Sequence, residues 1–168
     1  MKPEDLIAYC GVSCGTCARW CDYSEFRTLA AVLAEWVDAQ GYQFWMPTYA
    51  KDFDYTEFRK GLDFFSRNDT WLVCHNCCKG GDGNPECEIR KCCEKRGLNL
   101  CFHCEEFPCG KVKRDKKMVK RGKEYKELGR DEWVRQQAEK AKQGFELHTG
   151  KYYQIHAKEH PPPQSPNG

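Results

Sequence analysis

The chain has no long hydrophobic run, since the longest apolar stretch in its 168 residues is LAAVLA at 29–34. A membrane-spanning helix needs about 20 apolar residues, and a signal peptide needs an uninterrupted apolar stretch of about 7–15. The first residues, MKPEDLIAYCGVSC, carry acidic side chains where such a stretch would lie. We therefore expect a protein of the reducing cytoplasm that does not associate with membranes.

The motifs of several large enzyme classes are also missing. The sequence contains no Walker phosphate loop, no G-x-G-x-x-G and no H-E-x-x-H. Apolar residues, cysteine included, make up only 40% of the chain. The hydrophobic core is therefore expected to be small, and bound metal is expected to contribute to the free energy of folding.

Charge is divided unevenly along the chain. Residues 1–73 carry 7 Lys/Arg against 11 Asp/Glu, a net charge of −4, whereas residues 74–168 carry 20 against 14, a net charge of +6. The densest basic run, 111–126, has nine basic and two acidic residues. Such a run can follow a phosphate backbone, but no base-reading motif or exposed aromatic pattern accompanies it. A solvated helix face is the favoured interpretation, and nucleic-acid binding is not expected.

Cysteine, in contrast, is abundant, with 13 in the chain. In a reducing compartment, clustered thiols bind metal or perform redox chemistry more often than they form disulfides. Three C-x2-C units occur, and two such units can complete a tetrahedral zinc site. With four further cysteines they give ten candidate metal ligands, which are Cys10, Cys14, Cys17, Cys74, Cys77, Cys87, Cys92, Cys101, Cys104 and Cys109.

The identity of the metal is left open by the residues, because thiolate ligands suit both zinc and iron–sulfur clusters. We favour Zn²⁺, with two or more ions, in a structural role within a binding or adaptor module. The alternative is a 4Fe-4S protein that carries electrons or handles clusters. A thiol- or metal-dependent enzyme is a third, less favoured possibility, with Cys21, Cys78 or Cys93 as nucleophile. His75 and His103 lie inside C-x2-C units, where their side chains usually point away from the metal.

Short loops close at a lower entropic cost than long ones, which suggests a partition of the ligands into two sites. One site would close locally, and the other would join the N-terminal cysteines to the last three. The expected groups are Cys74, Cys77, Cys87 and Cys92 for the first, and Cys10, Cys14, Cys17, Cys101, Cys104 and Cys109 for the second.

Apolar periodicity predicts a mainly α-helical fold. Residues 24–41 have apolar side chains on one helical face, with Ser24 able to cap the start and Gly41 able to end the helix. Residues 54–68 repeat the pattern, with Asp54 and Glu57 spaced as in a capping box. We expect these two helices to form an insert at about 24–68, with their aromatic stripes packed in the core.

Three further helices are expected after the insert. Pro85 suits the first turn of a helix through 86–96, Pro108 could start another through the basic run, and 130–144 reads as the last, anchored by Trp133. The expected fold is a small cysteine-rich, metal-stabilised domain over 1–147, mainly α, with irregular loops and few or no strands. Its basic helical part spans about 108–143, and 148–168 is expected to be a disordered tail.

Four cysteine motifs together resemble a known family. They are CGVSCGTC near the N-terminus, CHNC in the middle, CEIRKC after a glycine-rich loop, and CFHCEEFPC at 101–109. Their order is similar to that of the cysteine-rich family named domain of unknown function 3795 (DUF3795), over about residues 8–112. The resemblance implies a bacterial or archaeal origin, frequently anaerobic, and metal binding through the ten cysteines above, with Cys21, Cys78 and Cys93 as additions. It implies no known activity. Some members continue into a zinc-ribbon-like end, whereas residues 144–156 here contain no cysteine.

Overall fold

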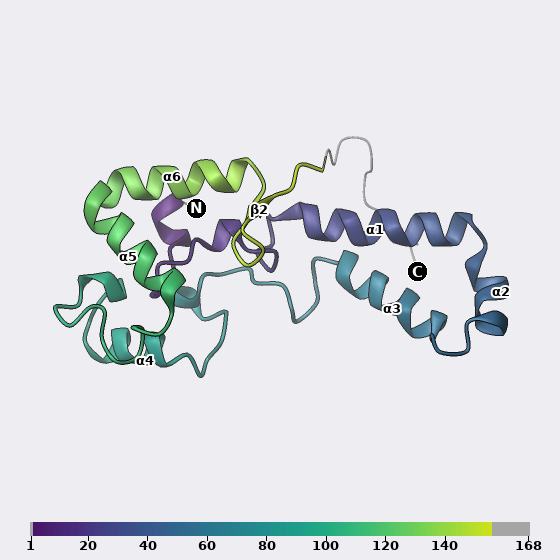
Figure 1. Ribbon diagram of the computed structural model, residues 1–168, viewed down its shortest axis with the longest axis horizontal. Coiled ribbons are helices and arrows are strands. Elements are labelled where there is room, and N and C mark those ends of the chain that lie inside the picture. Colours follow the sequence, from purple (N-terminus) through teal and green to yellow (C-terminus); the bar gives the residue numbers. More distant parts are fainter. Residues whose placement is uncertain (1, 156–168) are drawn as a thin grey trace.

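The computed structural model describes residues 2–155 as a mainly helical protein with one two-stranded sheet and long irregular loops (Figure 1). This confirms the expected fold class. The α-helices are α1 (Ser24–Ala39), α2 (Tyr42–Tyr49), α3 (Tyr55–Ser66), α4 (Glu88–Lys95), α5 (Lys116–Leu128) and α6 (Arg130–Lys142). Short 3-10 turns are η1 (Pro3–Leu6), η2 (Cys14–Thr16), η3 (Cys78–Gly80) and η4 (Cys101–His103), and the strands are β1 (Phe145–Glu146) and β2 (Lys151–Tyr152).

Helices α1, α2 and α3 form an arm that extends away from the rest of the molecule (Figure 1). The chain enters the arm after Cys21 and returns at Cys74, where Trp20 and Cys74 form an isolated parallel bridge. The Cys74 N–H donates to the Arg19 carbonyl at 2.7 Å, and the Cys21 N–H donates to the Cys74 carbonyl at 3.0 Å. The arm is therefore an insertion whose two ends are fastened together. We expected two helices in this insert, and the structure adds a third, α2.

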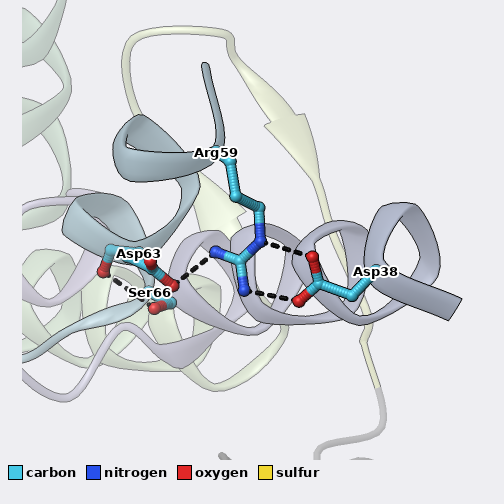
Figure 2. Close-up of polar contacts among 4 residues, drawn as sticks. All are labelled: Asp38, Arg59, Asp63 and Ser66. Carbon is cyan, nitrogen blue, oxygen red and sulfur yellow. Dashed lines mark hydrogen bonds and ion pairs between the residues drawn. The ribbon is translucent and has the colours of Figure 1, made fainter. Parts of the chain in front are cut away.

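The arm has its own small core, in which α1 packs against α3. Four side chains are buried there, Ala34, Val37, Tyr55 and Leu62. On the surface beside them, Arg59 of α3 donates two hydrogen bonds to the Asp38 carboxylate, at 2.8 and 2.6 Å, and a third to Asp63 (Figure 2). This paired geometry fixes the end of α1 against α3.

Two helices, α3 and α5, begin directly after a capping aspartate. The Asp54 carboxylate accepts a hydrogen bond from the Glu57 N–H at 3.0 Å, which confirms the expected cap of α3. Ser24 is the first residue of α1 and makes no capping bond, so the expected cap is wrong there. Helix α4 begins at Glu88, after a turn that contains Pro85. Helix α5 begins after Asp115, well beyond Pro108, because the Asp115 carboxylate accepts from the Met118 N–H at 2.9 Å.

The main core lies at the other end of the molecule, between the N-terminal segment and helices α4–α6. Trp133 is fully buried, which confirms it as the anchor of α6. Phe102 is wedged between two glycines: a β-carbon built on Gly11 would lie 2.2 Å from its ring, and one built on Gly122 would lie 3.1 Å from it. Gly11 also has a φ of +75°, which favours glycine. The two glycines therefore allow the backbone to approach Phe102 from both sides.

A short hairpin, β1 and β2, follows α6 and folds back toward the start of α1. Phe145 pairs with Tyr152, and Glu146 pairs with Lys151. The Tyr23 hydroxyl donates to the Gly144 carbonyl at 3.1 Å, which ties the hairpin to the root of the arm. Residues 148–152, expected to belong to the tail, are thus part of this hairpin. The tail residues 156–168 lie outside the part of the chain that the structure describes.

Candidate metal centre

Two C-x2-C units meet at the root of the arm. The Cys14 Sγ lies 3.4 Å from the Cys77 Sγ, although 63 residues separate them along the chain. The first unit is held by η2, in which the Cys17 N–H donates to the Cys14 carbonyl at 2.9 Å. The second unit is brought beside the first by the Trp20–Cys74 bridge. We call Cys14, Cys17, Cys74 and Cys77 the root cluster.

A histidine from the C-terminal hairpin also reaches this cluster. His148 Nε2 lies 3.9 Å from Cys17 Sγ. The hairpin is docked there by its backbone, because the Leu147 N–H donates to the Thr16 carbonyl at 2.9 Å. Sequence reasoning missed His148, and a single histidine in a turn between two-residue strands offers no pattern that could have identified it.

A second group of thiols lies within the main core. Five cysteines line a small cavity of about 20 Å³, together with Phe107 and Val112. A space of about 10–15 Å³ accommodates one water-sized atom, so this cavity has room for a single ion. The five, which we call the core cluster, are Cys92, Cys93, Cys101, Cys104 and Cys109. Cys10 packs against the same core.

Burial makes these thiols poor acids in the absence of a cation. Desolvation, together with the neighbouring thiols, raises the pKa of Cys93 to about 11 and that of Cys101 to about 12. In the root cluster, the contact with Cys14 raises the pKa of Cys77, and burial raises that of Cys17. A bound metal ion would reverse this balance, because a coordinated thiol is deprotonated.

One arginine brings a positive charge to the core cluster. The Arg96 guanidinium donates a hydrogen bond to Cys104 Sγ at 3.2 Å and pairs with the Glu106 carboxylate at 3.0 Å. Arg96 follows the last residue of α4, so the turn after this helix carries the positive charge toward the thiols.

The structure divides the ten candidate ligands differently from the partition expected from loop length. Cys77 lies against Cys14, and Cys92 shares a cavity with Cys101, Cys104 and Cys109. Each expected group is therefore split between the two clusters. As they stand, no three Cys, His, Asp or Glu side chains within residues 2–155 are close enough to hold one ion. The donor chemistry nonetheless fits a thiophilic metal, because the root cluster contains a close thiol pair from distant segments and five thiols line the cavity of the core cluster.

The three additional cysteines differ in their surroundings. Cys93 is buried among the core cluster, whereas Cys78 is half-buried next to Cys77, and Cys21 Sγ contacts the Asp22 carboxylate at 3.8 Å. Cys93 is thus a further candidate ligand that the family pattern did not require.

The two histidines within C-x2-C units are exposed. The backbone N–H of His75 donates to the Asp82 carboxylate at 2.7 Å, and His103 Nε2 lies 2.7 Å from the Tyr125 hydroxyl. Over the described residues, no helix combines the length and the apolar character needed to cross a membrane.

Comparison with curated proteins and with solved structures gives no match. The sequence profile of one family, described as "Protein of unknown function (DUF3795)", matches residues 6–114. This segment includes all ten candidate ligands and ends just before α5, while His148 lies beyond it. The match covers well over half of the chain and confirms the resemblance drawn from the cysteine motifs, so the chain belongs to the DUF3795 family.

Proposed function

We propose that this protein binds Zn²⁺ through its cysteines, that the metal stabilises the fold, and that the folded protein is a cytoplasmic module that binds another protein. The proposal assigns it no catalytic activity of its own. One ion belongs to the root cluster and a second to the core cluster.

The approach of Cys14 Sγ to Cys77 Sγ, at 3.4 Å, carries this proposal. In a tetrahedral site with Zn–S bonds of about 2.3 Å, two sulfur atoms lie about 3.8 Å apart. The observed separation is close to that value and far from the S–S bond length of about 2.05 Å. Both thiols are free, and their separation would allow them to share a cation.

The composition of the main core supports a structural role for the metal. Two of its nine buried residues are cysteines, and Cys10, Cys104 and Cys109 pack at its edge. These thiols occupy positions where a larger domain would have aliphatic side chains. Since metal binding supplies folding free energy in small thiol-rich domains, the ions would offset this shortage of apolar area.

The arm supports a role in binding. Its surface exposes large apolar side chains that a monomeric protein usually buries, among them Trp36 at 63% exposure, Phe44 at 82% and Tyr49 at 77%. Aromatic side chains are enriched at protein interfaces. Trp36 belongs to an apolar stripe that the sequence predicts to pack in the core, and the structure leaves it on the surface, whereas Phe44 and Tyr49 lie on the unpredicted helix α2.

The test begins with purification from the native host without oxygen, so that the native metal is retained. Elemental analysis is expected to give about two zinc ions per chain, in a colourless protein. Stoichiometric iron with acid-labile sulfide, and the corresponding visible and EPR spectra, would replace this proposal with the 4Fe-4S alternative.

Chelation then tests the structural role. Removing zinc from the loaded protein should abolish cooperative unfolding and collapse the dispersion of the amide NMR signals. The variant Cys14→Ser should lose one of the two ions, whereas the matched variant Cys21→Ser should keep both. A metal-free protein with native spectra would contradict the structural role.

A further inference from the structure

His148 is held in position by its own loop, independently of any metal. The buried Glu146 carboxylate accepts hydrogen bonds from the His148 and Thr149 N–H groups, at 3.0 and 2.8 Å. Lys117 Nζ of α5 donates to the His148 carbonyl at 3.4 Å. The ring is thus presented to Cys17 by a loop that is already ordered, which lowers the entropy lost when the imidazole binds a ligand.

We infer that His148 is a zinc ligand and that the root site is a Cys₃His site made of Cys14, Cys17, Cys77 and His148. This inference rests on the proposed zinc-binding function and names a ligand for one of its two sites. It draws the fourth donor from the C-terminal hairpin, outside the segment that matches the family.

The donor separations agree with this assignment. Zn–S bonds of about 2.3 Å and Zn–N bonds of about 2.0–2.1 Å give tetrahedral edges of about 3.8 Å between two sulfurs and about 3.6 Å between sulfur and nitrogen. The Cys14–Cys77 pair, at 3.4 Å, and the Cys17–His148 pair, at 3.9 Å, lie on either side of these values. The η2 turn joins the two pairs, because it begins at Cys14 and is followed directly by Cys17. No three potential ligands within residues 2–155 are close enough to hold one ion as they stand, so these side chains would have to move when the metal binds.

Cys74 is the competing fourth ligand, because it completes the second C-x2-C unit. Its backbone N–H and carbonyl are both used in the bridge to Arg19 and Cys21. Cys74 is close enough to Cys17 to interact with it electrostatically, but within residues 2–155 its Sγ makes no hydrogen bond, whereas His148 Nε2 lies 3.9 Å from Cys17 Sγ. The direct contact between Cys17 and His148 therefore favours the imidazole.

Local charge favours the imidazole as well. Zn²⁺ with four thiolates carries a net charge of −2, and with three thiolates and a neutral histidine it carries −1. The buried Glu146 carboxylate is close enough to interact electrostatically with Cys17. The Glu146 carboxylate repels the negatively charged thiolates of the site. A fourth thiolate would increase this repulsion in a partly desolvated environment, whereas a neutral imidazole would not.

The direct test uses the full-length protein loaded with ¹¹³Cd²⁺ in place of zinc, because the nuclear spin of the metal reports its ligands. A scalar coupling between one ¹¹³Cd signal and the His148 ring protons is expected in the wild type, which requires no variant to fold. The coupling should disappear in His148→Ala and persist in His103→Ala, the matched exposed histidine. Zinc affinity at one of the two sites should fall in His148→Ala on the order of 100-fold or more, by competition with a chelator.

Three outcomes separate this inference from the proposed function. Retention of zinc at the root site in Cys74→Ser, together with the coupling to His148, supports the inference. A cadmium signal coupled to the protons of Cys14, Cys17, Cys74 and Cys77, with no coupling to His148, overturns the Cys₃His site and leaves the zinc-binding function standing. Failure of the wild type to take up zinc or cadmium overturns both.

Discussion

Two helical glycines should respond to the same substitution with opposite signs. Gly61 of α3 has open space where a β-carbon would be, with nothing within 4 Å. At Gly122 of α5, a β-carbon would lie 2.3 and 2.4 Å from two ring atoms of Phe107. Carbon atoms pack best at about 3.5–4.0 Å, so the added methyl group would be more than about 1 Å too close.

The size of each effect follows from two opposing terms. Replacing glycine by alanine inside a helix gains about 0.8–1.0 kcal/mol, and this term is shared by both sites. Overpacking a core adds a cost of about 1–3 kcal/mol at Gly122 only. We therefore expect Gly61→Ala to stabilise the protein by up to about 1 kcal/mol, and Gly122→Ala to destabilise it by about 0–2 kcal/mol.

The rings at Gly122 have little room to move away. Phe107 packs edge-on against Phe102, with ring centroids 5.0 Å apart. Phe102 is itself blocked on another side by the backbone of Gly11. The strain should therefore remain in the folded state, and a smaller residue at position 107 should relieve it. In the double variant Gly122→Ala/Phe107→Leu, the decrease in the free energy of unfolding should be smaller than the sum of the decreases in the two single variants.

The measurement is urea unfolding, followed by circular dichroism, of each variant at one fixed free-zinc concentration. The metal concentration must be equal because a ligand that binds the folded state raises its stability by mass action. If Gly122→Ala matched or exceeded Gly61→Ala in the free energy of unfolding, the packing described around Phe107 and Phe102 would be refuted.

Three further predictions concern caps, charge and binding. Asp115→Ala should lower the free energy of unfolding by about 1 kcal/mol, measured by urea denaturation, because it removes the cap on the Met118 N–H; an unchanged value would contradict the cap. Hydrogen bonds from Arg59 lower the pKa of Asp38, so the stabilisation from this pair should be complete above about pH 4–5 and lost as the pH falls through the lower, folded-state pKa. Asp38→Asn should therefore lower the free energy of unfolding by less than about 1 kcal/mol at pH 7, since Asp38 is 45% exposed, and by a smaller amount at pH 2; an equal loss at both pH values would refute the role of the charge. The basic run at 111–126 should not retain DNA or RNA at low salt in a filter-binding assay, and binding that weakens steeply with salt would reverse this expectation.

The helices could be predicted wherever a local signal sets their ends. The Asp54 cap lies within one turn of the group that it binds, so the sequence identified it. Helix α2 has no comparable signal, because YQFWMPTY lacks helical periodicity and contains Pro47. The starts of α4 and α5 were placed too early because a proline permits the first turn of a helix without requiring one. At α5 the carboxylate of Asp115, and not Pro108, sets the start.

The C-x2-C units were visible in the sequence, but their grouping was not. Loop-closure entropy favours ligands that are near one another along the chain, which is the argument that assigned Cys77 to the local group. That argument omits backbone pairing: once Trp20 and Cys74 form their bridge, Cys77 is already near Cys14 and no further closure is needed. The position of His148 beside the root cluster depends on the docking of Leu147 against Thr16. This contact joins segments more than a hundred residues apart and has no local sequence signal.

The position of the root cluster connects the proposed metal to the proposed binding surface. A link between Cys14 and Cys77 closes a loop of 63 residues that contains the whole arm. In the chain-entropy description of cross-links, closing a loop of that length stabilises the folded state by about 4 kcal/mol. The arm has only four buried side chains in its own core, too few to hold its three helices without support from its root. Zinc at the root would thus decide whether the arm is folded, and with it whether Trp36 and Phe44 are displayed on a fixed surface. On this account the metal and the aromatic surface are coupled. Removing the ion would unfold the arm and so destroy the surface, although the metal does not contact the aromatic side chains.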